Sequence, residues 1–267
     1  MFKITPDSIK LVGFTEEAAG ARHYRFCLSD PFVHEHWQQA AAGQFFLLCL
    51  PEAGEAAFTF TRLPDANGEF SALVRPVGSV TQSLFGRKPG EIIGARGPFG
   101  IGWPQQALYE KRVLVVAGGC GIAPLCSVIE RQIEEETHAA MAVIFGARNP
   151  ATILLAAEQE RWSEAIDLYQ VIENAEGDSC QMEGTPLDAL PHAIAQMGGV
   201  PEISLICGPE GMMTAVADDL VRRGIPANSI YLSMERRMHC GIGLCGHCYI
   251  NDKYACTDGP VFRYSGT

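Results

Sequence analysis

The sequence predicts a multi-domain protein with an antiparallel β-barrel, a parallel α/β domain and a small cysteine-rich C-terminal segment. Short apolar or alternating runs, broken by Gly and Pro, fill about the first hundred residues. Continuous apolar strands then alternate with helical patterns, and closely spaced cysteines follow near the C-terminus. We expect the domains to span residues 1–106, 107–228 and 229–267.

The first domain is expected to contain six short strands. They span residues 9–14, 23–28, 44–50, 57–61, 69–77 and 91–95. Turn residues separate these runs, and no sustained helical period appears before Val80. This pattern is typical of a small antiparallel barrel.

Within the barrel, the strand that ends near Arg75 continues through Gly78 and Ser79 into a short helix. Free N–H groups at the helix start, with the Ser79 and Thr81 hydroxyls as further donors, would bind a pyrophosphate, and Gly78 would permit its close approach. The same pattern also fits an ordinary helix N-cap. The residues alone leave both interpretations open.

The second domain begins with an apolar strand at residues 111–117, typical of a buried parallel strand. A glycine-rich loop follows, and a helix is expected from Ala123 to about Glu136, with Pro124 tolerated in its first turn. Further strands are expected at residues 141–145, 167–172 and 203–207. The alternation predicts a doubly wound sheet with ligands at the carboxyl ends of its strands.

The glycine loop departs from the usual dinucleotide fingerprint. It lacks the third glycine, and the second strand runs into Arg148 where an acidic residue would hold a ribose. A second strand enters a helix through Cys207, Gly208 and Pro209. We therefore expect a different kind of nucleotide site at these strand ends, although Cys207 also fits a buried structural thiol.

Four cysteines near the C-terminus follow the C-x4-C-x2-C-x7-C spacing of a plant-type 2Fe-2S cluster. They are Cys240, Cys245, Cys248 and Cys256. Adjacent glycines allow the positive φ angles and N–H···S bonds that a backbone wrapped around a cluster needs. Structural zinc is the main alternative, but zinc ribbons usually pair two C-x2-C knuckles, and only Cys245 and Cys248 form one. His239 and His247 are expected to support the ligands rather than bind metal.

Composition limits the function classes. The formal net charge of −11 argues against nonspecific nucleic-acid binding. The N-terminus has no apolar signal region, and no apolar run approaches the ~20 residues of a membrane helix. The remaining cysteines are scattered through apolar stretches, as expected where thiols stay reduced. We expect a cytoplasmic protein with neither nucleic-acid nor membrane partners.

The order of barrel, parallel nucleotide domain and iron–sulfur run resembles the electron-transfer subunits of the ferredoxin-NADP reductase superfamily. The resemblance covers essentially the whole chain and is most specific over residues 231–248 and 256–262. It is strongest to the gamma subunits of cytoplasmic sulfhydrogenases and to the corresponding electron-transfer subunit of anaerobic sulfite reductase. The electron-transfer subunit of dihydroorotate dehydrogenase is a more distant match.

The resemblance implies an FAD site in the barrel. The flavin motif aligns with residues 57–61, so Phe58 would lie against the flavin and Thr59 near its N5 edge, with Thr61 closing the motif. Glu55 and Ala56 stand where the motif has its arginine, and Arg62 or Arg75 would replace it at the FAD phosphates.

The resemblance also implies two pyrophosphate sites. The FAD motif Gly-x-x-Thr matches Gly78, Ser79 and Thr81. The NAD(P) motif supplies the loop residues Gly118, Gly119, Gly121, Ala123 and Pro124. A Cys-Gly-Pro-x-x-Met motif matches Cys207, Gly208, Pro209 and Met212. It would put Cys207 beside the nicotinamide, and Arg148 would read the adenosine ribose.

The implied activity is NAD(P)H oxidation or formation coupled to a metalloenzyme. Because NAD(P)H delivers two electrons at once and the cluster accepts one, a flavin is expected between them. Thr59 and Cys207 are the residues expected at the reacting rings. Catalytic subunits such as a cytoplasmic NiFe hydrogenase or anaerobic sulfite reductase, reached through another iron–sulfur subunit, are the expected partners. A dihydroorotate dehydrogenase subunit and a redox-sensing module without significant turnover remain alternatives.

Overall fold

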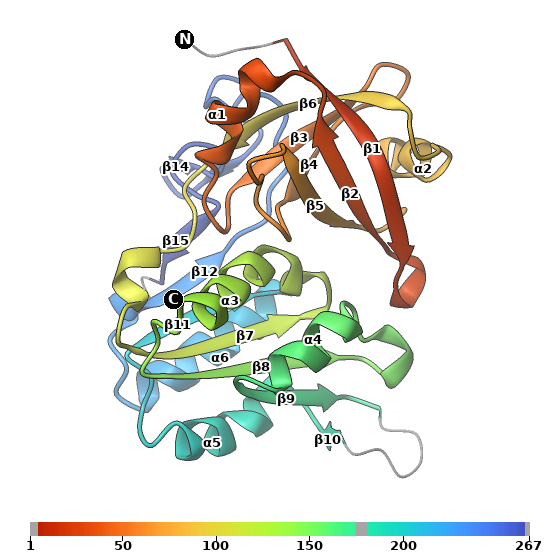
Figure 1. The fold of residues 1–267 in the computed structure, drawn as a ribbon. Coiled ribbons are helices and arrows are strands. Elements are labelled where there is room, and N and C mark those ends of the chain that lie inside the picture. The colour runs from red at the N-terminus through yellow and green to blue at the C-terminus, as the bar shows by residue number, and fades with distance from the viewer. Residues whose placement is uncertain (1–4, 175–180, 265–267) are drawn as a thin grey trace. The chain divides into compact units, whose positions relative to one another are not determined.

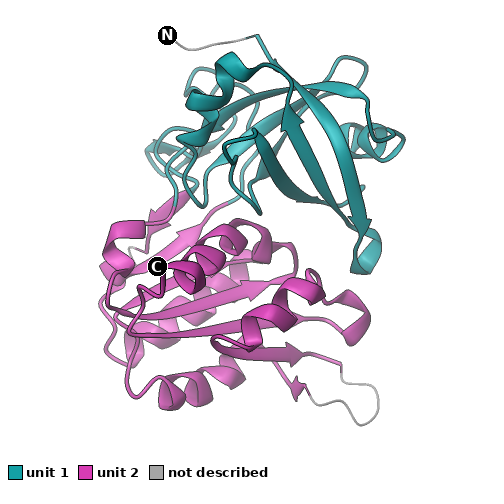
Figure 2. Cartoon of the chain, viewed as in Figure 1, with its two compact units in different colours: residues 1–102, 235–260 teal, residues 103–234, 261–267 magenta. Residues whose placement is uncertain are grey.

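The computed structural model describes residues 5–174 and 181–264 (Figure 1). The chain divides into two compact units (Figure 2). Unit 1 combines residues 1–102 with 235–260, and unit 2 combines residues 103–234 with 261–267. The segment expected at residues 229–267 is thus divided between the units, because its two ends form strands in the sheet of unit 2.

Unit 1 is built on six antiparallel strands in the order β4-β3-β6-β1-β2-β5, which confirms the predicted barrel. The strands are β1 (Asp7–Glu16), β2 (Arg22–Leu28), β3 (Phe45–Leu50), β4 (Gly54–Thr59), β5 (Glu69–Val74) and β6 (Ile92–Phe99). Beyond β4, the Thr61 N–H donates to the Ser71 carbonyl at 3.0 Å, and the Ser71 N–H donates to the Arg62 carbonyl at 3.1 Å. These bonds join the segment after β4 to β5 and so close the sheet.

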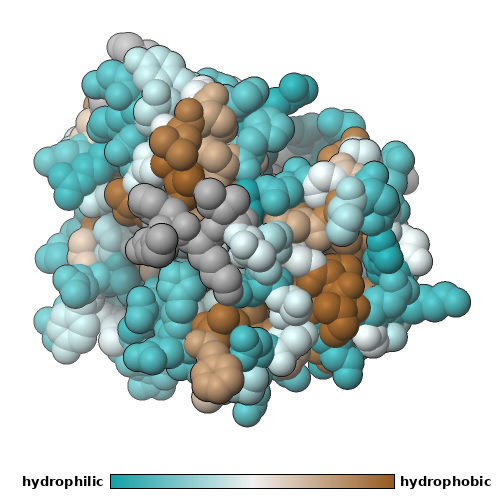
Figure 3. Space-filling model, turned by 90° about the horizontal axis from the view of Figure 1, so that it is seen from above, coloured by the Kyte–Doolittle hydropathy of each residue, from teal (hydrophilic) through white to brown (hydrophobic). Residues whose placement is uncertain are grey.

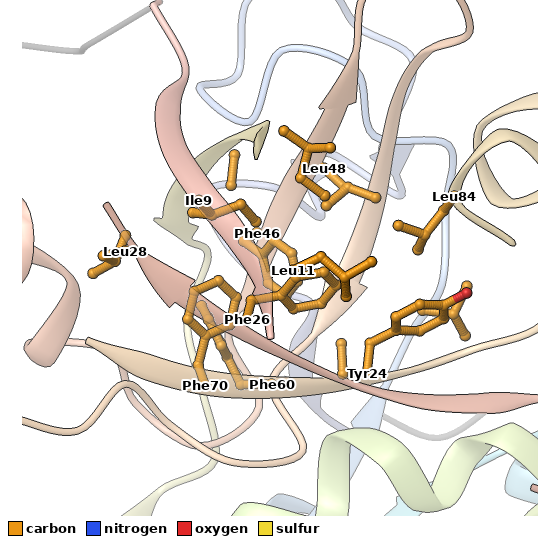
Figure 4. Packing of buried hydrophobic residues seen from close by; sticks show 14 of the residues in the cluster. Ile9, Leu11, Tyr24, Phe26, Leu28, Phe46, Leu48, Phe60, Phe70 and Leu84 are labelled. Atoms are coloured by element: carbon orange, nitrogen blue, oxygen red, sulfur yellow. The ribbon is translucent and has the colours of Figure 1, made fainter. Parts of the chain in front are cut away.

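Aromatic rings fill the interior of the barrel (Figure 4). The Phe46 ring centroid lies 5.0 Å from that of Phe60 and 5.2 Å from that of Phe70. Trp37 is fully buried, and its Nε1 donates to the Asp7 carboxylate at 3.0 Å. Trp37 belongs to α1 (His34–Gln38), a short helix that the sequence did not predict. The predicted helix after Gly78 is α2 (Ser79–Phe85).

Unit 2 contains a seven-stranded sheet in the order β10-β9-β8-β7-β11-β12-β15. Its strands are β7 (Arg112–Gly118), β8 (Ala140–Ala147), β9 (Asp167–Ile172), β10 (Met182–Glu183), β11 (Ile203–Cys207), β12 (Ile230–Ser233) and β15 (Val261–Arg263). All neighbours are parallel except β12 and β15, which are antiparallel. The predicted parallel sheet is confirmed, and β10, β12 and β15 are additions that the sequence pattern did not indicate.

Helices cover both faces of this sheet (Figure 1). They are α3 (Ala123–Glu135), α4 (Ala156–Ser163), α5 (Pro186–Gln196) and α6 (Glu210–Arg222). Apolar residues of α5 and α6 pack with Leu114, Val116 and Ile144 in one buried cluster. Because side chains alternate along a strand, Val113 and Val115 point to the opposite face, which α3 and α4 cover.

The cysteine-rich part of unit 1 has little regular structure. A hairpin formed by β13 (Tyr249–Ile250) and β14 (Lys253–Tyr254) turns through Asn251 and Asp252, which have φ angles of 46° and 62°. Asn and Asp tolerate this left-handed conformation better than most residues. No helix in the described part of the chain is long and apolar enough to cross a membrane.

Candidate redox-cofactor sites

The residues of the expected flavin motif lie on two faces of the barrel wall. Phe58 packs against the barrel core, with its ring centroid 6.1 Å from that of Phe46. Thr59 and Thr61 alternate with Phe58 and Phe60 and so lie on the face of the wall away from the core. The Thr61 hydroxyl is buried and lies 2.8 Å from His23 Nε2. A ligand on the outer face would therefore meet Thr59, whereas the hydroxyl of Thr61 is engaged by His23.

The expected pyrophosphate seat lies at the start of α2. The hydroxyl of Thr81 is buried and engaged by Gly78: it accepts from the Gly78 N–H and donates to the Gly78 carbonyl, both at 2.9 Å. Ser79 is exposed, and its hydroxyl donates to the Ala53 carbonyl at 3.3 Å. Arg75 is also exposed, just beyond β5. Thr81 therefore shapes the turn, whereas Ser79 and Arg75 face solvent.

Gly78 supports the close approach of a ligand. Its φ of −150° is an extended conformation that any residue adopts. A Cβ at this position would meet no heavy atom within 4 Å in the described part of the chain. Neither backbone strain nor neighbouring atoms require glycine there, and the open space beside its Cα fits a phosphate group.

Two glycine-containing loops pack together at the carboxyl ends of β7 and β11. A Cβ on Gly121 would lie 2.3 Å from the Cys207 carbonyl oxygen, and one on Gly118 would lie 2.7 Å from Met212 Sδ. Gly208 has a φ of 152°, and a Cβ there would lie 2.8 Å from Met212 Cε. The structure thus brings the two predicted nucleotide motifs together, and the glycines are needed for this contact.

Gly119 plays a different part in the same loop. It adopts a φ of 53°, and a Cβ on it would meet no heavy atom within 4 Å in the described residues.

Ala123 and Pro124 begin α3 directly after the loop. Trp103 Nε1 donates to the Pro124 carbonyl at 2.6 Å, and the Trp103 side chain is nearly fully buried. The sequence did not indicate Trp103, because a single tryptophan ahead of β7 carries no signal of a partner that is distant in the chain.

Cys207 and Arg148 lie at the same edge of the sheet in different environments. Cys207 is 1% exposed, and its Sγ lies 3.8 Å from the Ser233 carbonyl oxygen. Arg148 is exposed and follows β8, which pairs with β7 up to the Gly118 and Gly146 positions. The Arg148 side chain is thus available to a ligand at this edge, whereas the Cys207 thiol is buried.

The cysteine loop has the backbone conformation that the sequence predicted. Gly241, Gly243 and Gly246 have φ angles of 76°, 73° and 77°. The N–H groups of Ile242 and Leu244 point at Cys240 Sγ, at 3.5 and 3.4 Å. The Gly243 N–H donates to Cys256 Sγ at 3.2 Å. Backbone donors aimed at sulfur stabilise thiolates and the bridging cluster that they would hold.

The four cysteine thiols form two neighbouring pairs. Cys245 is exposed, and hydrogen bonds from the His247 backbone and from Cys240 lower the pKa of its thiol. Cys248 and Cys256 are each 1% exposed. Burial and a hydrogen bond with Cys248 raise the pKa of the Cys256 thiol to about 12. A hydrogen-bonded pair at Cys240 and Cys245 and a second at Cys248 and Cys256, with Cys245 exposed, fit a cluster of two irons near the surface.

His239 and His247 are exposed beside these cysteines, and their ring centroids are 4.6 Å apart. The two rings meet edge to face. The contact does not test the supporting role expected for the histidines, which stays a prediction.

Comparisons with family models and solved structures define the class of protein. Residues 115–218 match the oxidoreductase NAD-binding domain, and residues 235–266 match the iron–sulfur cluster binding domain of dihydroorotate dehydrogenase B. A solved NADH-dependent reduced ferredoxin-NADP oxidoreductase, described in a study of flavin-based electron bifurcation, aligns with a TM-score of 0.78. It is 25% identical, and the alignment covers 98% of this chain and 90% of that one. The fold is that of the ferredoxin-NADP reductases.

Curated relatives then define the family. Sulfhydrogenase 1 subunit gamma from Pyrococcus furiosus is 31% identical over 90% of this chain and 85% of its own length. A probable dihydroorotate dehydrogenase B electron transfer subunit from Archaeoglobus fulgidus is 34% identical over 84% of this chain and 86% of its own. The chain belongs to this family of electron-transfer subunits. It is an NAD(P)H-dependent oxidoreductase subunit whose cofactors are FAD, NAD(P)H and an iron–sulfur cluster.

Proposed function

We propose that this chain passes electrons between NAD(P)H and a metalloenzyme partner, through FAD on the barrel and a 2Fe-2S cluster on its four clustered cysteines. The observation that carries the proposal is the set of backbone N–H groups directed at Cys240 and Cys256. FAD, when bound, exchanges electron pairs with NAD(P)H and single electrons with the cluster. The remaining residues bind and orient these groups.

In unit 1, Thr59 would face the flavin, and Arg75, Gly78 and Ser79 would bind its phosphates. Phe58 would support that strand from inside the barrel, and Thr61 and Thr81 would hold the surrounding backbone through their hydroxyl contacts. In unit 2, the Gly118 to Pro124 loop would bind the NAD(P) pyrophosphate at the start of α3. Cys207, Gly208, Pro209 and Met212 would form the second wall of that site.

The partner would meet the cluster at its exposed side. Leu244 and Tyr249, which flank the exposed ligand Cys245, are 80% and 55% exposed. Figure 3 shows that hydrophobic residues form separate small areas on one largely hydrophilic face of the molecule. Exposed apolar side chains beside a cluster suit contact with another protein. A cytoplasmic NiFe hydrogenase or an anaerobic sulfite reductase, reached through an additional iron–sulfur subunit, is the partner we propose.

A second candidate is the electron-transfer subunit of a dihydroorotate dehydrogenase. The match of residues 235–266 to the iron–sulfur domain of that enzyme favours it. Anaerobic purification from the native cell would distinguish the candidates through the copurifying catalytic subunit. A redox sensor is the remaining alternative, and it would reduce dyes with NAD(P)H only negligibly.

Elemental analysis tests the proposed cofactors. Protein purified anaerobically is expected to contain one FAD and one 2Fe-2S cluster per chain, seen as matched amounts of iron and acid-labile sulfide. Stoichiometric zinc without acid-labile sulfide would contradict the proposal.

Replacement of Arg148 by alanine is expected to weaken NADPH binding about tenfold, as for a lost charge-assisted hydrogen bond, with little effect on NADH. The exposed guanidinium would contact the 2′-phosphate that only NADPH carries. Titration of both nucleotides by flavin fluorescence gives the two dissociation constants. Arg131→Ala, which removes an exposed arginine paired with Glu135 on α3, is the control. Equal effects of Arg148→Ala on both nucleotides would remove this role.

Cys207→Ala is expected to slow flavin reduction by NAD(P)H more than it weakens nucleotide binding. The thiol lies at the end of β11, where the family motif places the nicotinamide, and alanine keeps the close contact between Gly121 and the backbone. Stopped-flow absorbance measures the reduction rate constant and the apparent dissociation constant together. An unchanged rate constant would make Cys207 a structural thiol.

A further inference from the structure

Arg96 on β6 reaches from the barrel wall to the cysteine loop within unit 1. It is 7% exposed, although it carries a permanent charge. Its Nη1 donates to the Cys240 carbonyl, and its Nη2 donates to the His239 carbonyl, both at 3.1 Å. The backbone of the first cluster-ligand position is therefore held by a side chain of the barrel.

Glu55 on β4 supplies the counter-charge for Arg96. Arg96 Nε donates to Glu55 Oε1 at 3.2 Å, and Nη2 forms a closer ion pair with Glu55 Oε2. Burial alone would raise the pKa of Glu55, but hydrogen bonds from Arg96 and Cys49 hold it below its ordinary value. Cys49, opposite Glu55 in the sheet register, donates its thiol at 3.1 Å. Both charges thus belong to one hydrogen-bonded pair in the barrel wall.

The two loop carbonyls complete this network. Burial of a guanidinium costs free energy unless its N–H donors find acceptors. Glu55 accepts from only some of the five N–H groups of Arg96. The Cys240 carbonyl accepts from Nη1 of Arg96, and the His239 carbonyl accepts from Nη2. Phe99 on the same strand fixes the next residue, since a Cβ on Gly241 would lie 2.8 Å from its ring. Strand β6 therefore sets the position of three consecutive loop residues.

We propose that Arg96 is a positioning residue for the iron–sulfur cluster, and that the Arg96–Glu55 pair adjusts the reduction potential of that cluster. This proposal rests on the proposed function, because it assumes a cluster on the four cysteines. Arg96 places the Cys240 backbone, while the N–H groups of Ile242 and Leu244 point at its sulfur. A cation hydrogen-bonded to the ligand backbone favours the more negative, reduced cluster, and Glu55 offsets that effect.

Opposite substitutions in the pair are expected to shift the potential in opposite directions. Glu55→Gln leaves the Arg96 cation without its counter-charge and should raise the reduction potential. Arg96→Gln removes the cation beside Glu55 and should lower it. Arg96→Lys keeps a charge but loses the planar fork, so its potential should move less than that of Arg96→Gln. Lys10→Gln, which removes an exposed charge on β1, is the control and should leave the potential unchanged.

The second readout is independent of electron transfer. In Arg96→Gln and Arg96→Lys, amide hydrogen exchange over residues 239–244 should accelerate roughly tenfold or more, because hydrogen bonds to a charged group are lost. Exchange in β2 and β5 should stay unchanged and so report an intact barrel. Loss of the cluster from Arg96→Gln with retained FAD would itself support the positioning role.

The experiment is an EPR-monitored redox titration of each holoprotein, with iron, sulfide and FAD analysis and hydrogen exchange. Opposite shifts for the two glutamine variants support the proposal. Unchanged or same-direction potentials in the cluster-loaded variants, together with unchanged exchange in residues 239–244, would overturn it. If Arg96→Gln does not load, Glu55→Gln and Arg96→Lys decide the outcome. A wild-type protein without iron and sulfide would instead refute the proposed function.

Discussion

A variant with Cys245 and Cys248 both replaced by serine is expected to lose its iron–sulfur cluster and retain FAD. Serine oxygen is a poor substitute for thiolate at iron, and two of the four sulfurs would be absent. Reduction of the physiological partner should fall to background. A dye that takes electrons directly from flavin should still be reduced by NAD(P)H at close to the normal rate, since neither change touches the barrel strands or unit 2.

The two substitutions could also unfold unit 1, because the cysteine loop is part of this unit and Cys248 is 1% exposed. Retained FAD content and unchanged barrel hydrogen exchange would show that unit 1 is intact. Cys27→Ser, on β2 and outside the loop, controls for the loss of a thiol. Full reduction of the partner without a cluster would show that the loop is structural.

Gly121→Ala is expected to destabilise unit 2 and to abolish most NAD(P)H-driven flavin reduction. The added Cβ would lie 2.3 Å from the Cys207 carbonyl oxygen, so the two nucleotide loops must separate. Overpacking of this kind typically costs about 1–3 kcal/mol of unfolding free energy. The displaced loop would also lose its alignment with the nucleotide phosphates. Urea unfolding and NAD(P)H–dye assays measure the two effects.

Gly211→Ala provides a matched control at the start of α6. A Cβ there would meet no heavy atom within 4 Å in the described residues. Alanine is favoured over glycine in a helix by up to about 1 kcal/mol, so this variant should be as stable as the wild type or slightly more stable. Wild-type stability and turnover in Gly121→Ala would refute the role assigned to the close loop contact.

The barrel and the parallel sheet could be predicted because their signals are local. Alternating or continuous apolar runs marked β1 to β9 and β11, and the turn before α2 was visible at Gly78. Helix α1 was missed because it has only five residues and depends on the buried Trp37, whose partner Asp7 is distant in sequence. Strand β15 was missed for a similar reason, since its pairing with β12 spans the whole cysteine loop.

In the candidate sites, too, features set by neighbouring residues were predicted, whereas contacts between residues distant in sequence were not. Cysteine spacing and adjacent glycines predicted the left-handed backbone and the N–H···S contacts of the loop, and the structure confirms both. The contact of Arg96 with Cys240 joins residues 144 positions apart, so no spacing pattern indicates it. The hydroxyl of Thr81 was expected to face a ligand but caps its own turn, because the Gly78 backbone lies within hydrogen-bond distance.

The most direct test of the account is an anaerobic EPR measurement on the purified protein before and after addition of NAD(P)H. NAD(P)H is expected to bleach the flavin absorbance and to produce the signal of a reduced 2Fe-2S cluster in the same sample. Flavin bleaching without any cluster signal, in protein shown to contain iron and sulfide, would contradict electron transfer from NAD(P)H to the cluster.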